Sequence, residues 1–334
     1  MTTKPTQRIS TMRAVVQDRY GDTDMLRFEQ TARPTIADHE VLVRVHAAGL
    51  DRGTVHNMTG KPYLMRVLGF GFRGPKNRVP GLDVAGTVVE IGASVTRFAV
   101  GDEVYGISRG SFAEYAAARE DKLAPKPPSL TWEQAAVVPV SGITALQAIR
   151  DAGRLEAGQS VLVIGASGGV GSYAVQIAVS MGARVTGVAS TAKLDLVRSL
   201  GAEQVIDYTY EDFADGSHRY DLVLDIGGSS SLSRLRSAVA PRGTLVIVGG
   251  ESGGNLTGGI DRQLRAVLMS PFVGQRLTMH ATKERATDLA PLTDLVEAGQ
   301  VLPSLERTYR LDQVPEALRS LASGAVRGKV AVVV

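Results

Sequence analysis

Hydrophobic residues form a continuous run near the middle of the chain and then change to a helical spacing. Residues 161–164 are all apolar, as expected of a parallel strand that is buried on both faces. After a short gap, Val170, Ala174, Ile177 and Ala178 fall on one side of a helix. The pattern therefore predicts a strand, a turn and a helix in this order.

The turn between this strand and this helix is rich in glycine, with the sequence Ala-Ser-Gly-Gly-Val-Gly over residues 166–171. Glycines let the backbone bend sharply and let a phosphate come close, while the helix directs its free N–H groups and the positive end of its dipole at that phosphate. A second strand over residues 183–189 completes a βαβ unit of the length found in nucleotide-binding folds. We therefore predict a dinucleotide pyrophosphate site, and we expect a side chain at Gly169 to occupy the space of a phosphate.

Two other interpretations of the same stretch are open. The turn could be purely structural, as in many α/β sheets. The uncharged residues 157–183 could also suggest a membrane span, but the glycine cluster would leave backbone groups unpaired in lipid.

Alternating apolar and polar positions in the first third of the chain predict a mostly β domain. In residues 40–48, apolar residues alternate with Arg44 and His46. From Thr131, which can cap a helix, the pattern becomes helical. Further strands in this region are predicted over residues 12–18, 80–92, 100–106 and 110–115.

In the second half of the chain, strands and helices alternate. Apolar runs predict the fourth and fifth strands of the nucleotide domain, whose C-terminal ends should line the same crevice as the glycine turn. We expect a sixth strand over residues 269–273 and a mobile glycine-rich loop over residues 252–259. The other elements are strands over residues 221–228, 243–250 and 328–334 and helices over residues 194–200 and 289–299.

Length and composition limit the class of protein. With 334 residues, the chain exceeds what one hydrophobic core usually serves, so two domains are expected. The net charge is only +3 and the basic residues are spread along the chain, which disfavours nucleic acid as a partner. The chain has no cysteine, and Met1–Thr11 is polar without the apolar core of a secretory signal. These features favour a cytoplasmic protein without membrane contact and with a flexible leader over residues 1–11.

The residues after the second strand of the βαβ unit indicate which cofactor binds. An acidic residue about 20 positions past the glycines usually holds a free ribose hydroxyl, and none is present there. Ser190 and Lys193 stand in its place and would attract a 2′-phosphate, which favours NADPH. Alternatively, both residues only cap and solubilise the following helix.

Several separately spaced motifs together resemble the medium-chain dehydrogenase/reductase superfamily, and within it the zinc-independent quinone oxidoreductase (zeta-crystallin-like) branch. These motifs are Met-Arg-Ala-Val-Val at residue 12, Pro-Gly-Leu-Asp-Val-Ala-Gly at 80, Gly-Asp-Glu-Val at 101, Gly-Ile-Thr-Ala at 142 and the glycine turn. The resemblance implies an α/β fold with a GroES-like, mostly β catalytic domain (residues 12–135 and 277–334) and a doubly wound, parallel-sheet Rossmann domain (residues 136–276). It also implies a homodimer joined at the sixth strand.

The same resemblance completes the expected cofactor site. It adds Tyr208 beside the 2′-phosphate and the backbone of Gly249 and Gly250 near the nicotinamide. The predicted cofactor-binding residues are Thr144, Gly165, Ser167, Gly168, Gly169, Val170, Gly171, Ser190, Lys193, Tyr208, Gly249 and Gly250.

No metal site is expected. The positions that match the catalytic zinc ligands of zinc-dependent relatives carry Asp51 and Leu82, the latter followed by Asp83. Leucine cannot ligate a metal, and zinc sites use three or four N, S or O ligands. The five histidines also form no closely spaced pair.

The reactive end of the cofactor should face the loop over residues 49–63, where Asp51, His56 and Tyr63 are the catalytic candidates. Asp51 could orient a water or the nicotinamide ribose, or it could only cap backbone N–H groups. His56 or Tyr63 could protonate the product, as could water. Residues 64–75 alternate bulky apolar residues with glycines, either as a flexible lid or as a loop that packs for its own stability.

These residues predict hydride transfer from NADPH to a small-molecule quinone or conjugated enone. One alternative is an alcohol or aldehyde dehydrogenase. The other is a non-catalytic NADPH-binding protein, since a fold does not dictate a function.

Overall fold

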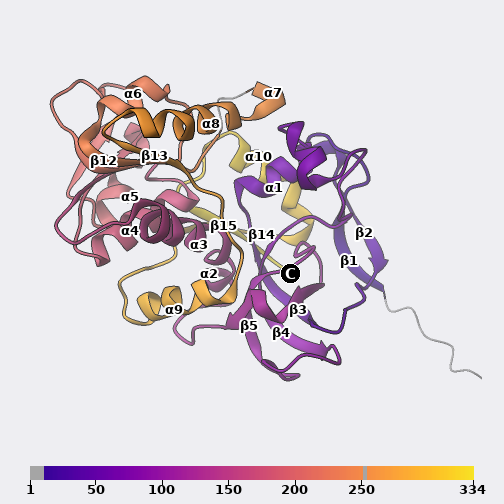
Figure 1. The fold of residues 1–334 in the computed structure, drawn as a ribbon. Coiled ribbons are helices and arrows are strands. Elements are labelled where there is room, and N and C mark those ends of the chain that lie inside the picture. Colours follow the sequence, from indigo (N-terminus) through magenta and orange to yellow (C-terminus); the bar gives the residue numbers. More distant parts are fainter. Residues whose placement is uncertain (1–10, 251–253) are drawn as a thin grey trace, which may run out of the picture.

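A six-stranded parallel sheet forms the centre of one domain in the computed structural model, which describes residues 11–250 and 254–334 (Figure 1). Its strand order, β10-β9-β8-β11-β12-β13, is that of a doubly wound nucleotide-binding fold. The strands are β8 (Ser160–Ile164), β9 (Arg184–Ala189), β10 (Gln204–Asp207), β11 (Tyr220–Asp225), β12 (Val239–Ile247) and β13 (Arg276–Met279).

Helices cover both faces of this sheet, and β8 shows why its sequence is apolar throughout. Val161 and Val163 pack in one core cluster with α3 and α4, whereas Leu162 and Ile164 pack in another with α6 and α8. The expectation of a strand buried on both faces is therefore confirmed. The helices of this domain are α3 (Pro139–Gln147), η4 (Ala148–Gly153), α4 (Gly169–Ser180), η5 (Thr191–Lys193), α5 (Leu194–Ser199), α6 (Leu232–Ser237), α7 (Gly254–Thr257), α8 (Ile260–Met269) and η6 (Ser270–Phe272).

The second domain is built on a seven-stranded sheet of order β14-β15-β3-β4-β5-β7, with β6 also paired to β3. The C-terminal strand β15 pairs antiparallel with β3, so the chain returns to the domain in which it began. The strands are β3 (Glu40–Gly49), β4 (Asp83–Ile91), β5 (Glu103–Ile107), β6 (Tyr115–Arg119), β7 (Leu123–Pro125), β14 (Leu305–Arg310) and β15 (Lys329–Val333), beside a separate pair of β1 (Thr11–Val16) and β2 (Arg27–Ala32).

The helices of this second domain are mostly short. Thr131 caps α2 in a reciprocal capping box with Gln134, which confirms the helix start expected there. The helical segments are η1 (Thr23–Met25), α1 (Arg52–Thr59), η2 (Arg66–Phe70), η3 (Glu120–Lys122), α2 (Trp132–Ala136), η7 (Ala286–Asp288), α9 (Leu289–Glu297), η8 (Leu311–Gln313) and α10 (Val314–Ala322).

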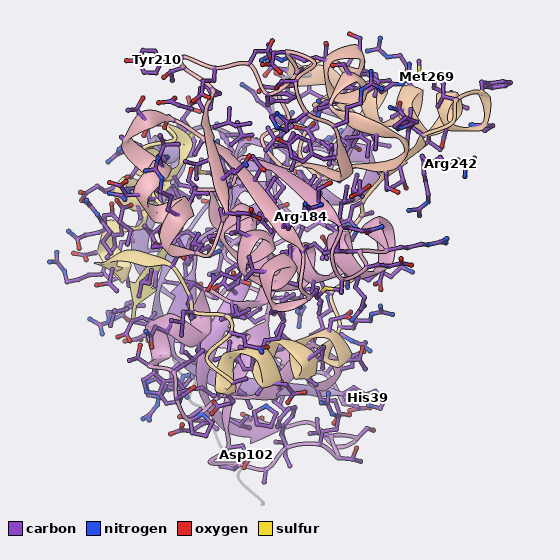
Figure 2. The ribbon with its side chains drawn as sticks, turned by 90° about the vertical axis from the view of Figure 1, so that its left-hand side faces the viewer. His39, Asp102, Arg184, Tyr210, Arg242 and Met269 are labelled. Carbon is purple, nitrogen blue, oxygen red and sulfur yellow. The ribbon has the colours of Figure 1, made fainter. Side chains whose placement is uncertain are left out.

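The two domains lie side by side, and the late strands of the chain run between them. Figure 1 shows the parallel-sheet domain at the upper left, the mostly β domain at the lower right, and β14 and β15 between them. In the turned view of Figure 2, His39 and Asp102 lie at one end of the molecule and Tyr210 and Met269 at the other. Within residues 11–250 and 254–334, no helix has the length and apolar character needed to cross a membrane.

Two predicted strands are placed differently by the structure. The sixth strand was expected over residues 269–273, but Pro271 lies in the short helical turn η6 and the strand β13 begins at Arg276. Proline lacks an N–H and has a fixed φ, so it suits the first turn of a helix better than a strand. The strand expected over residues 110–115 begins only at Tyr115, because Gly110 turns the chain at a φ of 76°.

Other expectations touch residues outside the described ranges. Residues 1–10 of the expected leader lie outside them, whereas Thr11 is the first residue of β1. Of the expected mobile loop over residues 252–259, residues 252–253 lie outside, and Gly254–Thr257 form the short helix α7. The domain limits remain a prediction; β13 ends at Met279, beyond the expected boundary at residue 276.

Candidate functional site

The glycine turn connects the end of β8 to the start of α4. Gly165 adopts a φ of 87°, which a residue with a side chain rarely takes up. A Cβ at Gly171 would lie only 2.1 Å from the carbonyl oxygen of Gly165, so the helix can approach the strand end only without a side chain there. Gly168 is the N-terminal cap of α4, and Val170 lies in the first turn. The strand, turn and helix predicted for this stretch are confirmed.

Space for a ligand at this helix end lies beside Gly168 and not beside Gly169. A Cβ at Gly168 would have only the Gly165 oxygen within 4 Å, at 3.5 Å. A Cβ at Gly169 would lie 2.9 Å from Cδ of Lys329 and 3.2 Å from Oγ of Ser141. A side chain at Gly169 would therefore meet Lys329 first, and its expected effect on a phosphate stays a prediction. The open N-terminus at Gly168 suits the pyrophosphate of a dinucleotide.

The residues expected at the 2′-phosphate come from neighbouring strand ends. Ser190 stands at the N-cap position of η5 without a side-chain cap hydrogen bond, and the backbone N–H of Tyr208 donates to the carbonyl oxygen of Ala189 over 3.2 Å. The Tyr208 side chain is 58% exposed. These two residues therefore lie on the same edge of the sheet.

Lys193 is held by the other domain. Its ammonium donates to the carbonyl oxygens of Gly324 over 2.6 Å and Val326 over 2.8 Å. Burial lowers the pKa of Lys193; the charge of Glu306 opposes this shift, and those of Arg327 and Arg52 add to it. Three basic residues therefore gather at this end of the site, of which the sequence argument had considered only Lys193.

Asp51 both caps a helix and keeps an oxygen available. Its Oδ1 accepts a hydrogen bond from the backbone N–H of Thr54 over 2.8 Å at the start of α1. The capping role named from the sequence is therefore present. Its Oδ2 is buried and accepts no hydrogen bond from residues 11–250 and 254–334. A bound hydroxyl or amide could satisfy this oxygen, which fits an adjacent nicotinamide ribose.

The two other catalytic candidates follow along the same segment. Nδ1 of His56, within α1, lies 3.1 Å from the carbonyl oxygen of Lys61. The Tyr63 side chain is 42% exposed, with the Arg66 guanidinium 4.6 Å from its ring centre. The backbone N–H of Tyr63 donates to the carbonyl oxygen of Asn255 over 2.8 Å, so this segment touches the parallel-sheet domain. Phe72, in the segment that could have packed for its own stability, is instead 75% exposed.

A buried ion pair that the sequence argument missed fixes the strand ends near the expected nicotinamide. Nη1 of Arg262, on α8, lies 2.7 Å from Oδ2 of Asp225 at the end of β11. Arg262 also donates to the carbonyl oxygens of Ser230 over 2.6 Å and Gly249 over 2.9 Å. Burial raises the pKa of Asp225, although Arg262 opposes that shift. The pair therefore ties the loops after β11 and β12 to α8.

Backbone and side-chain contacts also engage the remaining predicted residues. A Cβ at Gly250 would lie 2.1 Å from the carbonyl oxygen of Gly258, so the backbones meet closely there. Oγ1 of Thr144, on α3, donates to the carbonyl oxygen of Val140 over 2.6 Å. The carbonyl oxygen of Ser167 accepts from the N–H of Gly328 over 2.8 Å.

A second buried charge cluster lies next to Leu82, the position that the family resemblance matches to a zinc ligand. Lys329 and Asp83 are almost fully buried, and their charged atoms are 3.5 Å apart. Burial, together with the charge of Asp51, raises the pKa of Asp83 to about 7, although the charge of Lys329 lowers it. Leu82 packs against the hydrophobic core. In the described part of the chain, no three His, Cys, Asp or Glu residues are grouped so as to hold a metal ion.

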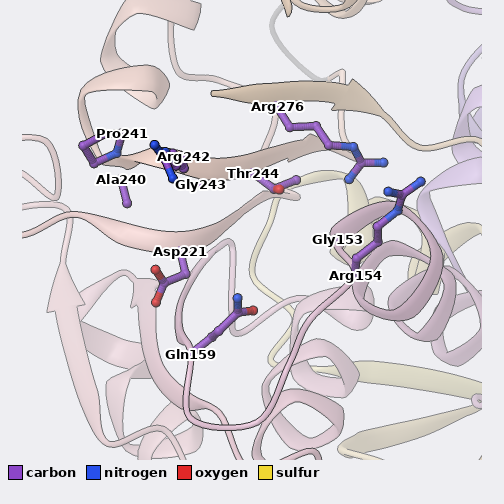
Figure 3. Close-up of a pocket in the computed structure, with 10 residues that line it drawn as sticks. All are labelled: Gly153, Arg154, Gln159, Asp221, Ala240, Pro241, Arg242, Gly243, Thr244 and Arg276. Carbon is purple, nitrogen blue, oxygen red and sulfur yellow. The ribbon is translucent and has the colours of Figure 1, made fainter. Parts of the chain in front are cut away.

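A hollow of the parallel-sheet domain lies away from this site. A cavity of about 550 Å³ opens at the amino-terminal edge of the parallel sheet, between Arg154, Arg242, Arg276, Asp221 and Gln159 (Figure 3). Gln159 precedes β8, and Asp221 and Arg276 lie at the starts of their strands. The glycine turn follows the opposite ends of these strands, so the cavity is not part of the candidate site.

Comparison with known proteins agrees with this arrangement. The family "Alcohol dehydrogenase GroES-like domain" matches residues 37–128, and the family "Zinc-binding dehydrogenase" matches residues 200–332. The mouse protein named NAD(P)H oxidoreductase RTN4IP1, mitochondrial, is 33% identical over 97% of this chain and 90% of its own. The 2-methylene-furan-3-one reductase of Solanum lycopersicum is 33% identical over 97% of this chain and 79% of its own.

Solved structures give the same result. The quinone oxidoreductase from Coxiella burnetii superposes with a TM-score of 0.87 at 28% identity, covering 97% of this chain and all of that one. The chain therefore belongs to the medium-chain dehydrogenase/reductase superfamily, in its zinc-independent quinone oxidoreductase branch. It is an NAD(P)H-dependent oxidoreductase with the GroES-like and Rossmann domains of that family.

Replacing Arg262 by methionine should destabilise the protein, because it leaves Asp225 charged and buried without its partner. Breaking such a pair typically costs about 3–5 kcal/mol, which should lower the thermal unfolding midpoint markedly. The control is Arg265→Met, since Arg265 pairs with Asp261 on the surface of the same helix and should change the midpoint little. The double variant Asp225→Asn/Arg262→Met should recover part of the loss. Equal midpoints for both single variants would contradict this account.

Proposed function

We propose that this protein is a zinc-independent, NADPH-dependent reductase of conjugated enones or quinones. Two observations carry the proposal: the open, side-chain-free N-terminus of α4 at Gly168, and the buried Oδ2 of Asp51, which accepts no hydrogen bond from the described residues. The first suits a dinucleotide phosphate, and the second suits a hydroxyl of the same cofactor. The printed names of the relatives support the substrate class, since a 2-methylene-furan-3-one carries a carbon–carbon double bond conjugated with a ketone.

NADPH is favoured over NADH by the charges at the adenosine end. The charge of Glu306 raises the pKa of the Lys193 ammonium, and the charges of Arg327 and Arg52 lower it. A 2′-phosphate would form charge-assisted hydrogen bonds with this lysine, which a ribose hydroxyl cannot do. Asp207, at the end of β10, is the nearby acid that could hold a ribose hydroxyl instead. Its two carboxylate oxygens already accept hydrogen bonds from the hydroxyls of Thr191 and Thr209.

Lys193→Ala should therefore weaken NADPH binding by about 10-fold or more, the scale of a lost charge-assisted hydrogen bond. NADH binding should change much less, because NADH lacks the phosphate. Both dissociation constants can be measured by cofactor fluorescence titration, with Lys122→Ala as a control at a surface ion pair with Glu284. Equal losses for NADPH and NADH would show that Lys193 only joins the domains.

The residues facing the expected nicotinamide have roles that follow from their chemistry. Bound NADPH would supply a hydride to the β-carbon of the enone or to the quinone. A proton must then reach the α-carbon or the oxygen of the product, and His56 or Tyr63 is placed on the loop from which it could come. Asp51 would accept a hydrogen bond from the cofactor and would keep its cap on α1.

Loss of NADPH absorbance in the presence of a panel of quinones and enones tests the proposed reaction. With a substrate that the wild-type protein reduces, His56→Phe or Tyr63→Phe should lower kcat by about 100-fold if that residue donates the proton. The affinity for NADPH should change little. Wild-type rates for both variants would identify solvent as the donor.

Two outcomes would favour another function. NADPH binding without turnover across the panel would indicate a non-catalytic binding protein. Alcohol oxidation that depends on added zinc would indicate an alcohol dehydrogenase.

We also propose a homodimer joined at the edge strand β13. Next to this edge, Phe272 is 86% exposed and Leu268 is 71% exposed, and both could be covered by a second copy. Phe272→Asp should convert a dimer to a monomer in light scattering, whereas Phe72→Asp, an equally exposed residue on the other domain, should not. A monomeric wild-type protein would contradict the proposal.

The absence of cysteine supports a cytoplasmic location. The mouse relative is named as mitochondrial. Fractionation of cells that express the full chain would decide between these compartments.

A further inference from the structure

Lys329 connects three parts of the fold through one buried ammonium. It is the first residue of β15, and only 2% of its surface is exposed. Its Nζ donates to the carbonyl oxygen of Leu50 over 2.7 Å and to Oγ of Ser141 over 3.0 Å. Leu50 directly precedes Asp51, and Ser141 lies on α3 of the parallel-sheet domain. The ammonium therefore joins the segment that carries the catalytic candidates to the cofactor domain.

The stem of the same side chain lies against the glycine turn. Cδ of Lys329 occupies the space that a Cβ at Gly169 would need. The preceding residue, Gly328, donates its N–H to the carbonyl oxygen of Ser167 in that turn. The start of β15 therefore contacts the turn through both its backbone and its lysine stem.

A carboxylate and two hydrogen-bond acceptors compensate the burial of this charge. Asp83 lies 3.5 Å from Nζ, and its Oδ1 accepts the backbone N–H of Val140 over 2.8 Å. The other titratable groups close to Asp83 are Asp51 and Tyr173, whose hydroxyl donates to the carbonyl oxygen of Val137. An ammonium placed here without such partners would be strongly destabilising.

We propose that Lys329 is a positioning residue that sets the Leu50–Asp51 segment against the glycine turn. It thereby fixes the distance between the catalytic loop and the cofactor. This inference rests on the proposed function for its catalytic consequence but not for its structural part. Leu50 directly precedes Asp51. The hydrogen bond from Lys329 to the Leu50 carbonyl oxygen therefore orients Asp51, both its Oδ1, which caps α1, and its Oδ2.

Lys329→Met tests the proposal because methionine keeps most of the length of the side chain and removes the three donors. It should lower kcat by about 10- to 100-fold, the usual cost of a small misplacement of reacting groups, with a smaller change in the NADPH dissociation constant. Amide hydrogen exchange over residues 50–56 should become faster in the cofactor-free protein. Lys122→Met, at a surface ion pair, should change none of these quantities.

The double variant Asp83→Asn/Lys329→Met separates positioning from charge balance. It removes both charges, so it should fold even if Lys329→Met does not. Persistent loss of kcat and fast exchange over residues 50–56 in the double variant would support positioning. Recovery of both quantities to wild-type values would overturn it, because Lys329 would then serve only to neutralise Asp83. If the wild-type protein lacks turnover, the proposed function fails, and the exchange measurement still tests the positioning.

Discussion

The close approach of α4 to the end of β8 is the constraint on which the site depends. Gly171 must lack a side chain because the carbonyl oxygen of Gly165 lies where its Cβ would be, and Gly165 itself adopts a φ of 87° that favours glycine. This contact points the N-terminus of α4 along the carboxyl edge of the sheet. The ends of β9, β10, β11 and β12 reach the same edge because the sheet is parallel. Without this contact, the N-terminus of α4 would not lie at the edge where these strands end, and no single ligand could contact both.

Two buried ion pairs, one in each domain, restrain the backbone around the candidate site. Asp225 and Arg262 restrain the loops after β11 and β12, whereas Asp83 and Lys329 join β4 and β15 below the catalytic segment. Each pair combines an acid at the end of a strand with a base from an element far along the chain. Buried pairs of this kind add little stability compared with apolar residues, but losing one partner is very unfavourable. They therefore impose a single arrangement of the backbone more than they strengthen the fold.

Sequence periodicity predicted the sheet and its glycine turn because these depend on local patterns. The apolar run at residues 161–164, the glycines after it and the capping residue Thr131 act within a few positions of the chain. The sixth strand was misplaced because Ser270 and Pro271 interrupt an apolar stretch, and the helical turn there wins over the strand. The contact between Gly169 and Lys329 was not predicted, because the two residues are remote in sequence.

The missed site residues left a weak signal that local reasoning does not weigh. Lys329 is the one charge in the otherwise apolar closing strand, and Asp83 is the one charge among residues 79–89. A charge inside an apolar run is either exposed at an edge or paired in the core. The sequence alone does not identify the ion-pair partner of either residue, because the partner depends on the pairing of β15 with β3 in the folded chain.

The pairing of the C-terminal strand β15 with β3 also determines the order in which contacts can form during synthesis of the chain. Leu50, Asp83 and Ser141 leave the ribosome long before Lys329, and domains generally begin to fold from the N-terminal side. During this interval Asp83 has no ammonium beside it, and the space next to Gly169 is unfilled. A nascent chain can therefore form the parallel sheet and the glycine turn well before its catalytic segment is locked in place. Binding of a nucleotide to such a chain would precede any ability to reduce a substrate.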